Sequence, residues 1–312
     1  MEENLPISPS AHLLDSARRD VNTRVLTILN CLLRRDCELN GENAILVRSL
    51  RMDVRDSLAE YTWDDDLKKK LTSSDTKQEL LPEQIIDRLI EIIKDISPDL
   101  SEHHENVAKL AFLMGTILEK TPSVFTNYDK ETALKTEYSA YVHDIGKLDA
   151  RIATIIAQNK MLELPEKLVV AYHARIGAIV LKHLGLPKEV TDVADFHHIT
   201  LPHSPRNQSY PVSSLPVAVC LTTVADSVDA MTSSRPGNCI KTIGYVLSEL
   251  EDGVSDELED GVSWGKYDKA AVTAFSSICA ELGYDKTSEE FVTVKELLKK
   301  YNGKLEGKVA CA

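Results

Sequence analysis

Apolar side chains recur at intervals of three and four residues along most of this chain, and this spacing limits its fold more than any other feature. The pattern is clear at residues 10–35 and 82–96, and helical segments continue to residue 301. Runs in which apolar and polar residues alternate, as in half-buried β-strands, are very few. The sequence therefore predicts an all-α fold.

The length of the chain and one polar stretch suggest two domains. A chain of 312 residues exceeds the size at which a single hydrophobic core usually stops growing. Residues 64–78 are charged and polar with no apolar stripe, which is typical of a linker. We predict a smaller helical N-terminal domain at residues 1–96, ending in a connecting helix, and a larger helical domain at residues 97–312.

The charge and the cysteines bear on partners and location. The formal net charge of −13 opposes non-specific binding to a nucleic acid polymer or to an anionic membrane. The six cysteines include no C-x-x-C pair, which indicates free thiols in a reducing compartment. The first residues have no signal-peptide pattern, and no apolar run reaches about 18 residues. We expect a soluble, cytoplasmic protein.

Histidines interrupt several of the apolar segments. His103 and His173 each lie on the apolar stripe of a predicted helix. His143 and Asp144 are adjacent, and neighbouring residues on a helix point about 100° apart. The two side chains could therefore bind two sides of one ion, or one ion each of a close pair. Taken alone, such a dipeptide is more often a capping aspartate beside a partly buried histidine.

Further polar residues occupy segments where they need a partner. His197 and His198 are adjacent shortly before Pro202, and Asp226 and Asp229 lie in an otherwise apolar helix. Ionised carboxylates are rarely buried unpaired. A pair of bound cations would satisfy all of these side chains. A mixed set of imidazoles and carboxylates suits two octahedral iron or manganese ions better than zinc.

The order of these motifs resembles the HD-GYP branch of the HD-domain superfamily. The resemblance covers roughly residues 98–285 and rests on His103, HDIGK at 143–147, HARIG at 173–177, the paired histidines and ADSVDAMTSSRP at 225–236. It implies an HD-domain helical bundle that hydrolyses a cyclic dinucleotide, typically cyclic di-GMP, to a linear dinucleotide or GMP. A hydroxide bridging two metal ions would be the nucleophile.

The resemblance also implies roles for individual residues. Seven residues would hold the two ions, with Asp144 bridging them: His103, His143, Asp144 and Asp226 on the first, and His173, His197 and His198 on the second. Lys147 would act in catalysis beside Asp144 and contact the substrate, and Arg175 and Arg235 are further candidates for substrate contacts. For Lys147 and Arg235 the alternative is an ordinary surface ion pair.

One segment departs from the family pattern. After the paired histidines, Ile199 stands where the family has Glu, and Ser209 stands where the family has the first Gly of Gly-Tyr-Pro. Tyr210 and Pro211 follow four residues later than the pattern places them. The departure bears on a third metal ion and on Tyr210, the family's candidate for a tyrosine contact to substrate.

Two alternatives stay open. The altered signature favours a degenerate signalling or binding protein of this type with little turnover. A generic HD phosphohydrolase acting on mononucleotides would need only one His, the His-Asp pair and one Asp, which leaves His173, His197 and His198 unexplained. The N-terminal helices are candidates for homodimerisation or for binding a protein partner.

Overall fold

The computed structural model describes residues 81–120, 130–198, 215–234, 239–254, 256–257, 263–264 and 266–310. These residues are helical apart from turns and two strands of two residues each, so the all-α prediction is confirmed for the described part of the chain. No helix among them is both long and apolar enough to cross a membrane. The helices predicted before residue 81 lie outside the described residues, so the N-terminal domain stays a prediction.

The elements follow one another closely along the chain. The first eight are α4 (Pro82–Ile96), α5 (Pro98–Glu119), α6 (Lys130–Tyr141), the 3₁₀ helix η1 (Ile145–Leu148), α7 (Ala150–Ile156), α8 (Leu164–Ala171), α9 (His173–His183) and α10 (Lys188–Phe196). The others are α11 (Val217–Thr232), α12 (Ile243–Asp252), β1 (Asp256–Glu257), β2 (Ser263–Trp264), α13 (Lys269–Glu281) and α14 (Val294–Ala310). The strands β1 and β2 form an antiparallel pair.

Helix α4 covers residues 82–96, where the sequence predicts a helix. It begins at Pro82, whose missing N–H costs nothing in the first helical turn, and the Gln84 side chain accepts a hydrogen bond from the Leu81 N–H at 3.0 Å. Its apolar stripe buries Ile86, Leu89 and Ile93. The helix packs against α5 and α6, so it forms one body with the helices that follow it.

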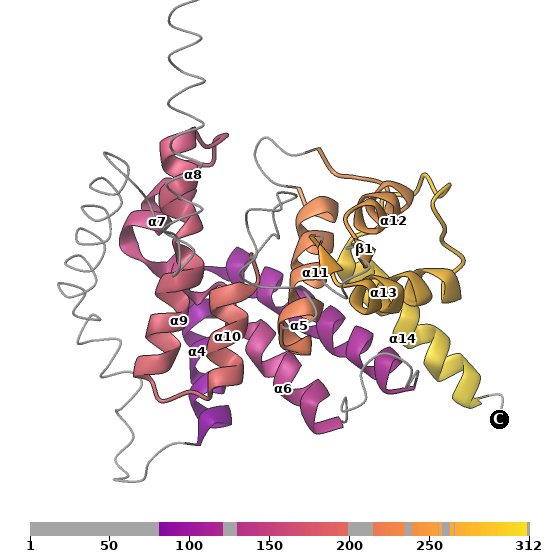
Figure 1. Cartoon of the computed structure of the whole chain (residues 1–312), viewed down its shortest axis with the longest axis horizontal. Helices are drawn as coiled ribbons and strands as arrows, with labels where there is room; N and C mark the ends of the chain where they lie inside the picture. Colours follow the sequence, from indigo (N-terminus) through magenta and orange to yellow (C-terminus); the bar gives the residue numbers. More distant parts are fainter. Residues whose placement is uncertain are drawn as a thin grey trace, which may run out of the picture. The chain divides into compact units, whose positions relative to one another are not determined.

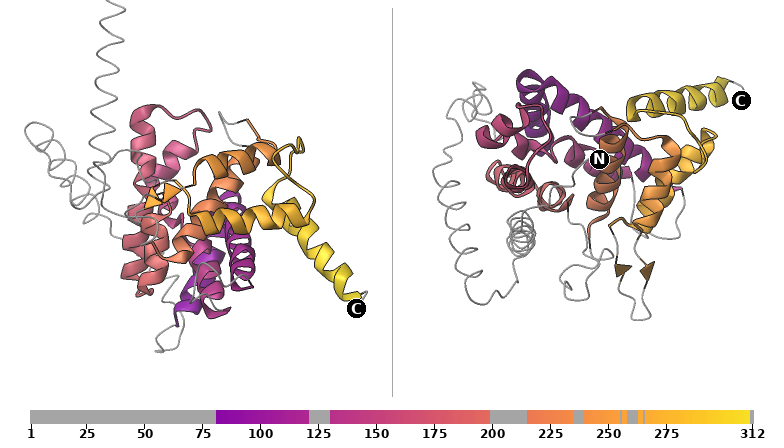
Figure 2. Two further views of the ribbon diagram at one scale, coloured as in Figure 1. Left: turned by 45° about the vertical axis from the view of Figure 1, so that its right-hand side comes forward. Right: turned by 90° about the horizontal axis from the view of Figure 1, so that it is seen from above.

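Helices α5, α6 and α11 form the centre of the arrangement (Figure 1). Helix α10 packs against α6 and α9. Helices α12 and α13, which follow α11 in the sequence, pack against α11. In both views of Figure 2 the C-terminal part of α14 projects away from the other helices. The part of α14 that packs against α5 buries Val294, Leu297 and Tyr301.

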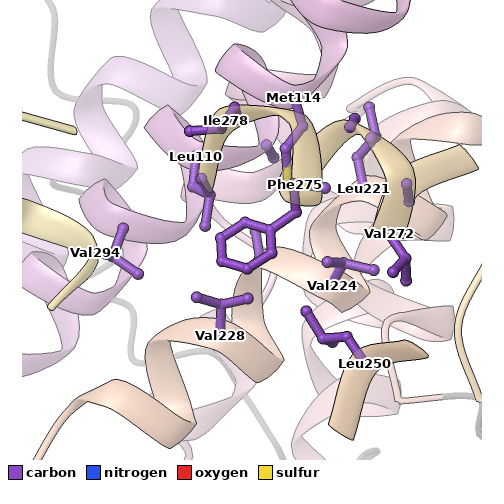
Figure 3. Packing of buried hydrophobic residues seen from close by; sticks show 14 of the residues in the cluster. Leu110, Met114, Leu221, Val224, Val228, Leu250, Val272, Phe275, Ile278 and Val294 are labelled. Carbon is purple, nitrogen blue, oxygen red and sulfur yellow. The ribbon is translucent and has the colours of Figure 1, made fainter. Parts of the chain in front are cut away.

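The main hydrophobic core lies between α5, α11, α12 and α13 (Figure 3). The ring of Phe275 on α13 is fully buried and lies among Leu110 of α5, Val224 and Val228 of α11, and Ile278. Burial of apolar area is the main force that holds such helices together. This core therefore fixes α5 relative to α11, and both helices carry candidate metal ligands.

A side-chain cap begins α13. The Asp268 carboxylate accepts a hydrogen bond from the Ala271 N–H at 2.9 Å. We expect Asp268→Ala to lower the free energy of unfolding by about 1 kcal/mol, because the N–H loses its partner. Asp268→Asn keeps an acceptor oxygen and should cost much less. Chemical denaturation of the two variants measures the difference, and equal losses would contradict the capping role.

Candidate metal centre

The structure brings together all seven residues that the sequence predicts as metal ligands. They come from five places in the chain: His103 from α5, His143 and Asp144 from the turn between α6 and η1, His173 from the start of α9, His197 and His198 from the end of α10, and Asp226 from α11. All are buried except His198, whose side chain is 47% exposed.

These residues form two overlapping clusters. The first cluster contains His103, His143, Asp144 and Asp226, and the second cluster contains Asp144, His173, His197 and His198. Within each cluster the residues offer ligand atoms that all lie within 4.8 Å of one another. The two clusters are consistent with binding of two metal ions; the structure does not identify the metal.

Asp144 is the residue that the clusters share. Its Oδ2 lies 3.3 Å from His103 Nε2 and 3.4 Å from His143 Nε2. Its Oδ1 lies 2.8 Å from His173 Nε2 and 3.3 Å from His197 Nε2. Each oxygen of this one carboxylate therefore faces a different cluster, which is the arrangement that a bridging ligand needs.

Backbone hydrogen bonds orient three of the imidazole rings. The Nδ1 atoms of His143, His173 and His197 lie 2.7, 2.5 and 3.0 Å from the carbonyl oxygens three residues earlier. A ring that donates from Nδ1 keeps the lone pair of Nε2 for a metal ion. The Nε2 of His143 is buried with no hydrogen-bond partner among the described residues, so the donor set fits a bound cation.

A carboxylate orients the fourth ring. Asp229 Oδ2 accepts a hydrogen bond from His103 Nδ1 at 2.7 Å, and Asp229 Oδ1 accepts another from the Asn106 side-chain amide at 3.0 Å. The Nε2 of His103 is thereby turned toward Asp144 and Asp226, at 3.3 Å from an oxygen of each. Asp229 thus orients the His103 ring through the Nδ1 hydrogen bond and is not itself a member of either cluster.

We expect Asp229→Asn to weaken metal binding about 10- to 100-fold, the usual effect of changing a residue that orients a metal-bound histidine. The amide keeps the size of the side chain but removes the negative charge behind the His103 ring. Titration of the metal against a competing chelator measures the affinity. Asp95→Asn, an exposed change on α4, is the matched control. Equal affinity in the two variants would contradict the role of Asp229.

Burial and neighbouring charges set the protonation states of the first cluster. Burial lowers the pKa of His143 to about 3, so this ring is neutral at ordinary pH. Burial also lowers the pKa of His103, but hydrogen bonds to three carboxylates outweigh it and raise the value to about 10. In the metal-free protein His103 therefore carries a proton that a metal ion must displace.

The carboxylates stay ionised despite their burial. Burial alone would raise the pKa of Asp144 and of Asp226. The Lys147 ammonium has the largest opposing effect on Asp144, and the hydrogen bond from His103 has it on Asp226. Both pKa values consequently lie well below the ordinary value, and both groups are in the form that binds cations.

The predicted substrate contacts are only partly described. The Lys147 ammonium pairs with Asp144 Oδ2, and its side chain is 17% exposed at the edge of the clusters. The Arg175 guanidinium donates to Asp195 at 2.6 Å and joins α9 to α10. A contact between Arg175 and a phosphate would compete with this pair. Arg235 and Tyr210 lie outside the described residues, as do Ile199 and Ser209.

One buried histidine beside the clusters was missed by the sequence reasoning. The ring of His104 is 2% exposed, and its centroid lies 5.0 Å from that of His143 and 5.9 Å from that of His103. Burial lowers its pKa well below the ordinary value. The sequence pattern could have predicted its burial, because the apolar residues Val107, Ala108 and Ala111 follow His104 at helical spacing, and they are also buried.

In a comparison with known protein families, residues 100–231 match the HD domain, and this range contains all seven candidate ligands. The chain is 26% identical over 192 residues to a cyclic di-GMP phosphodiesterase of Thermotoga maritima; the match covers 59% of this chain and 50% of that protein. The chain thus spans about half the length of this relative.

Two solved structures are also similar. Both are of the HD domain of the L. monocytogenes phosphodiesterase PgpH, one of them in complex with cyclic-di-AMP. They are 16% identical to this chain, with TM-scores of 0.36 and 0.35, and cover 70% and 71% of it and 96% and 98% of their own chains. The family match agrees with the HD-domain part of the resemblance drawn from the motifs.

Proposed function

We propose that this chain is a metal-dependent phosphohydrolase that cleaves a phosphodiester bond of a cyclic dinucleotide, with cyclic di-GMP as the first candidate substrate. The product would be a linear dinucleotide, or GMP after a second cleavage. The two clusters would hold one ion each, with iron and manganese as the candidates for this donor set. The similarity to the cyclic di-GMP phosphodiesterase of T. maritima supports the substrate class.

The observation that carries the proposal is the position of Asp144. A mononuclear HD phosphohydrolase needs only the first cluster. Here the second oxygen of Asp144 faces His173 and His197, whose Nδ1 atoms are already hydrogen-bonded to the backbone. Burying these imidazoles around a carboxylate would be costly without a second cation. The second cluster therefore favours a binuclear phosphodiesterase over an enzyme that uses one ion.

The bound ions, Lys147 and the burial of the site would each contribute to the proposed hydrolysis. When bound, two close ions lower the pKa of water and neutralise charge on the phosphate oxygens. The Lys147 ammonium lies beside Asp144 at the edge of the clusters and is our candidate to contact the phosphate or to protonate the leaving oxygen. The surrounding burial strengthens each of these charge interactions by lowering the local dielectric constant.

The degenerate binding protein is the second candidate. It rests on the altered signature after the paired histidines, which lies outside the described residues. The converging set of seven side chains opposes it, because a protein without turnover has no need to keep two complete clusters.

Metal content and turnover test the proposal together. Protein purified anaerobically without chelator should contain about two transition-metal ions per chain and should convert cyclic di-GMP to a linear product seen by chromatography. Cyclic di-AMP serves as the comparison substrate. One ion or none would refute the binuclear site. Two ions without turnover of either cyclic dinucleotide would refute the enzyme and favour the binding protein.

A further inference from the structure

A cavity of about 250 Å³ lies between α11, α12 and the residues just before α13. These elements are neighbours in Figure 1. The side chains that give the cavity its character are two lysines, two tyrosines, one glutamate and one methionine: Lys241, Lys266, Tyr245, Tyr267, Glu249 and Met231. None of its lining residues belongs to the first or the second cluster, so the cavity is a separate feature.

Backbone hydrogen bonds hold the walls of the cavity in place. The Lys241 N–H donates to the Met231 carbonyl at 2.9 Å, which joins the segment before α12 to the end of α11. The N–H groups of Lys266 and Tyr267 both donate to the Gly253 carbonyl, at 2.9 and 3.0 Å. The two lysines therefore extend from backbone positions that are fixed relative to one another.

The cavity is positively charged although the whole chain is acidic. The Lys241 ammonium lies 4.9 Å from the centroid of the Tyr245 ring, and the Lys266 ammonium lies 4.7 Å from that of the Tyr267 ring. Cation–π contacts of this kind hold an ammonium group beside a ring without neutralising it. Glu249 is the one carboxylate among the lining residues, and it accepts a hydrogen bond from the Tyr245 hydroxyl at 3.3 Å. Two ammonium groups on one cavity suit a phosphate.

The two tyrosines contribute differently to the cavity. Tyr245 is 47% exposed, so its ring is open to a planar ligand. Tyr267 is 1% exposed and its phenol oxygen is buried, so it supports the Lys266 ammonium through its ring and does not offer its hydroxyl to a ligand. A ligand that combines an anion with a flat polar ring would match the two ammonium groups and the ring of Tyr245.

We propose that this cavity binds a nucleoside monophosphate, with the phosphate between Lys241 and Lys266 and the base against Tyr245 and Met231. The volume is just below the range of pockets that enclose drug-sized ligands, so it suits a mononucleotide that stays partly in solvent, not a second cyclic dinucleotide. The Glu249 carboxylate can accept a hydrogen bond from an N–H of the base. The ligand would contact the same helix, α11, that carries Asp226.

Calorimetric titration with guanosine 5′-monophosphate tests the site. The titration uses two variants of the full chain, Asp144→Asn and His198→Ala. Each impairs binding at the metal clusters, so the result does not depend on hydrolysis. We expect saturable binding in both backgrounds. Adding Lys241→Gln with Lys266→Gln should raise the Kd at least about tenfold, because two charge-assisted contacts are lost.

The controls separate this site from a simple anion site. Lys94→Gln with Lys299→Gln makes the same charge change at exposed positions on α4 and α14 and should leave the Kd unchanged. Tyr245→Ala removes the exposed ring and should weaken binding with no change in charge. Guanosine and inorganic phosphate are titrated alongside. Absence of saturable binding, an unchanged Kd in the lysine variant, or phosphate binding as tightly as the nucleotide would each overturn the proposal.

Discussion

Asp144→Asn is expected to abolish hydrolysis and to release metal from both clusters. Each carboxylate oxygen of Asp144 faces the Nε2 atoms of a different pair of histidines, so one substitution changes a ligand in both clusters. The amide is neutral, and one of its two terminal atoms is a donor that cannot bind a cation. We expect the turnover of cyclic di-GMP to fall by about 10³-fold or more, with less than one ion retained per chain.

Elemental analysis and turnover are measured on the same preparation of this variant. The exposed Asp95→Asn variant should keep both properties and serves as the control. Loss of turnover with both ions retained would show that Asp144 does not bridge them. Turnover at the normal rate would show that catalysis does not need Asp144.

The fold class and the candidate ligands could be predicted because both leave a local signal in the sequence. Helical spacing marks the buried stripe of α5, and the polar residues that interrupt such stripes are the candidate ligands. A charged or imidazole side chain on a buried stripe needs a partner, whatever the tertiary structure. His103 and Asp226 could be identified in this way before any contact between them was known, and they lie 3.3 Å apart.

Other parts of the site depend on how the helices pack, which periodicity does not encode. The sequence makes Arg175 a candidate for a substrate contact but does not reveal its pairing with Asp195, which lies 20 residues away on α10 and becomes a neighbour only when α9 and α10 pack together. His143 and Asp144 lie in a turn, not inside a helix, and this turn brings His143 Nε2 to 3.4 Å from Asp144 Oδ2, which helical geometry does not predict. The support of His103 by Asp229 likewise joins two helices that are far apart in sequence.

Gly146→Ala is expected to destabilise the fold and to open the second cluster. A Cβ at position 146 would lie 2.0 Å from the His173 carbonyl oxygen and 2.7 Å from the Gly177 backbone nitrogen. Both atoms belong to the backbone of α9, so a rotamer change cannot relieve the clash, and η1 must move away from α9. That movement separates Asp144 Oδ1 from His173 Nε2, which are 2.8 Å apart.

We expect the free energy of unfolding to fall by about 2–4 kcal/mol, at or above the usual cost of overpacking because the backbone itself must shift. Chemical denaturation measures the stability, and elemental analysis measures the metal, of which the second cluster should lose most. Gly303→Ala is the matched control, because a Cβ there meets nothing within 4 Å and alanine favours helix. Gly177→Ala should be intermediate, since its closest contact is 3.2 Å. A Gly146→Ala protein as stable as the Gly303→Ala protein, with both ions bound, would show that the close approach of η1 to α9 is not needed to assemble the second cluster.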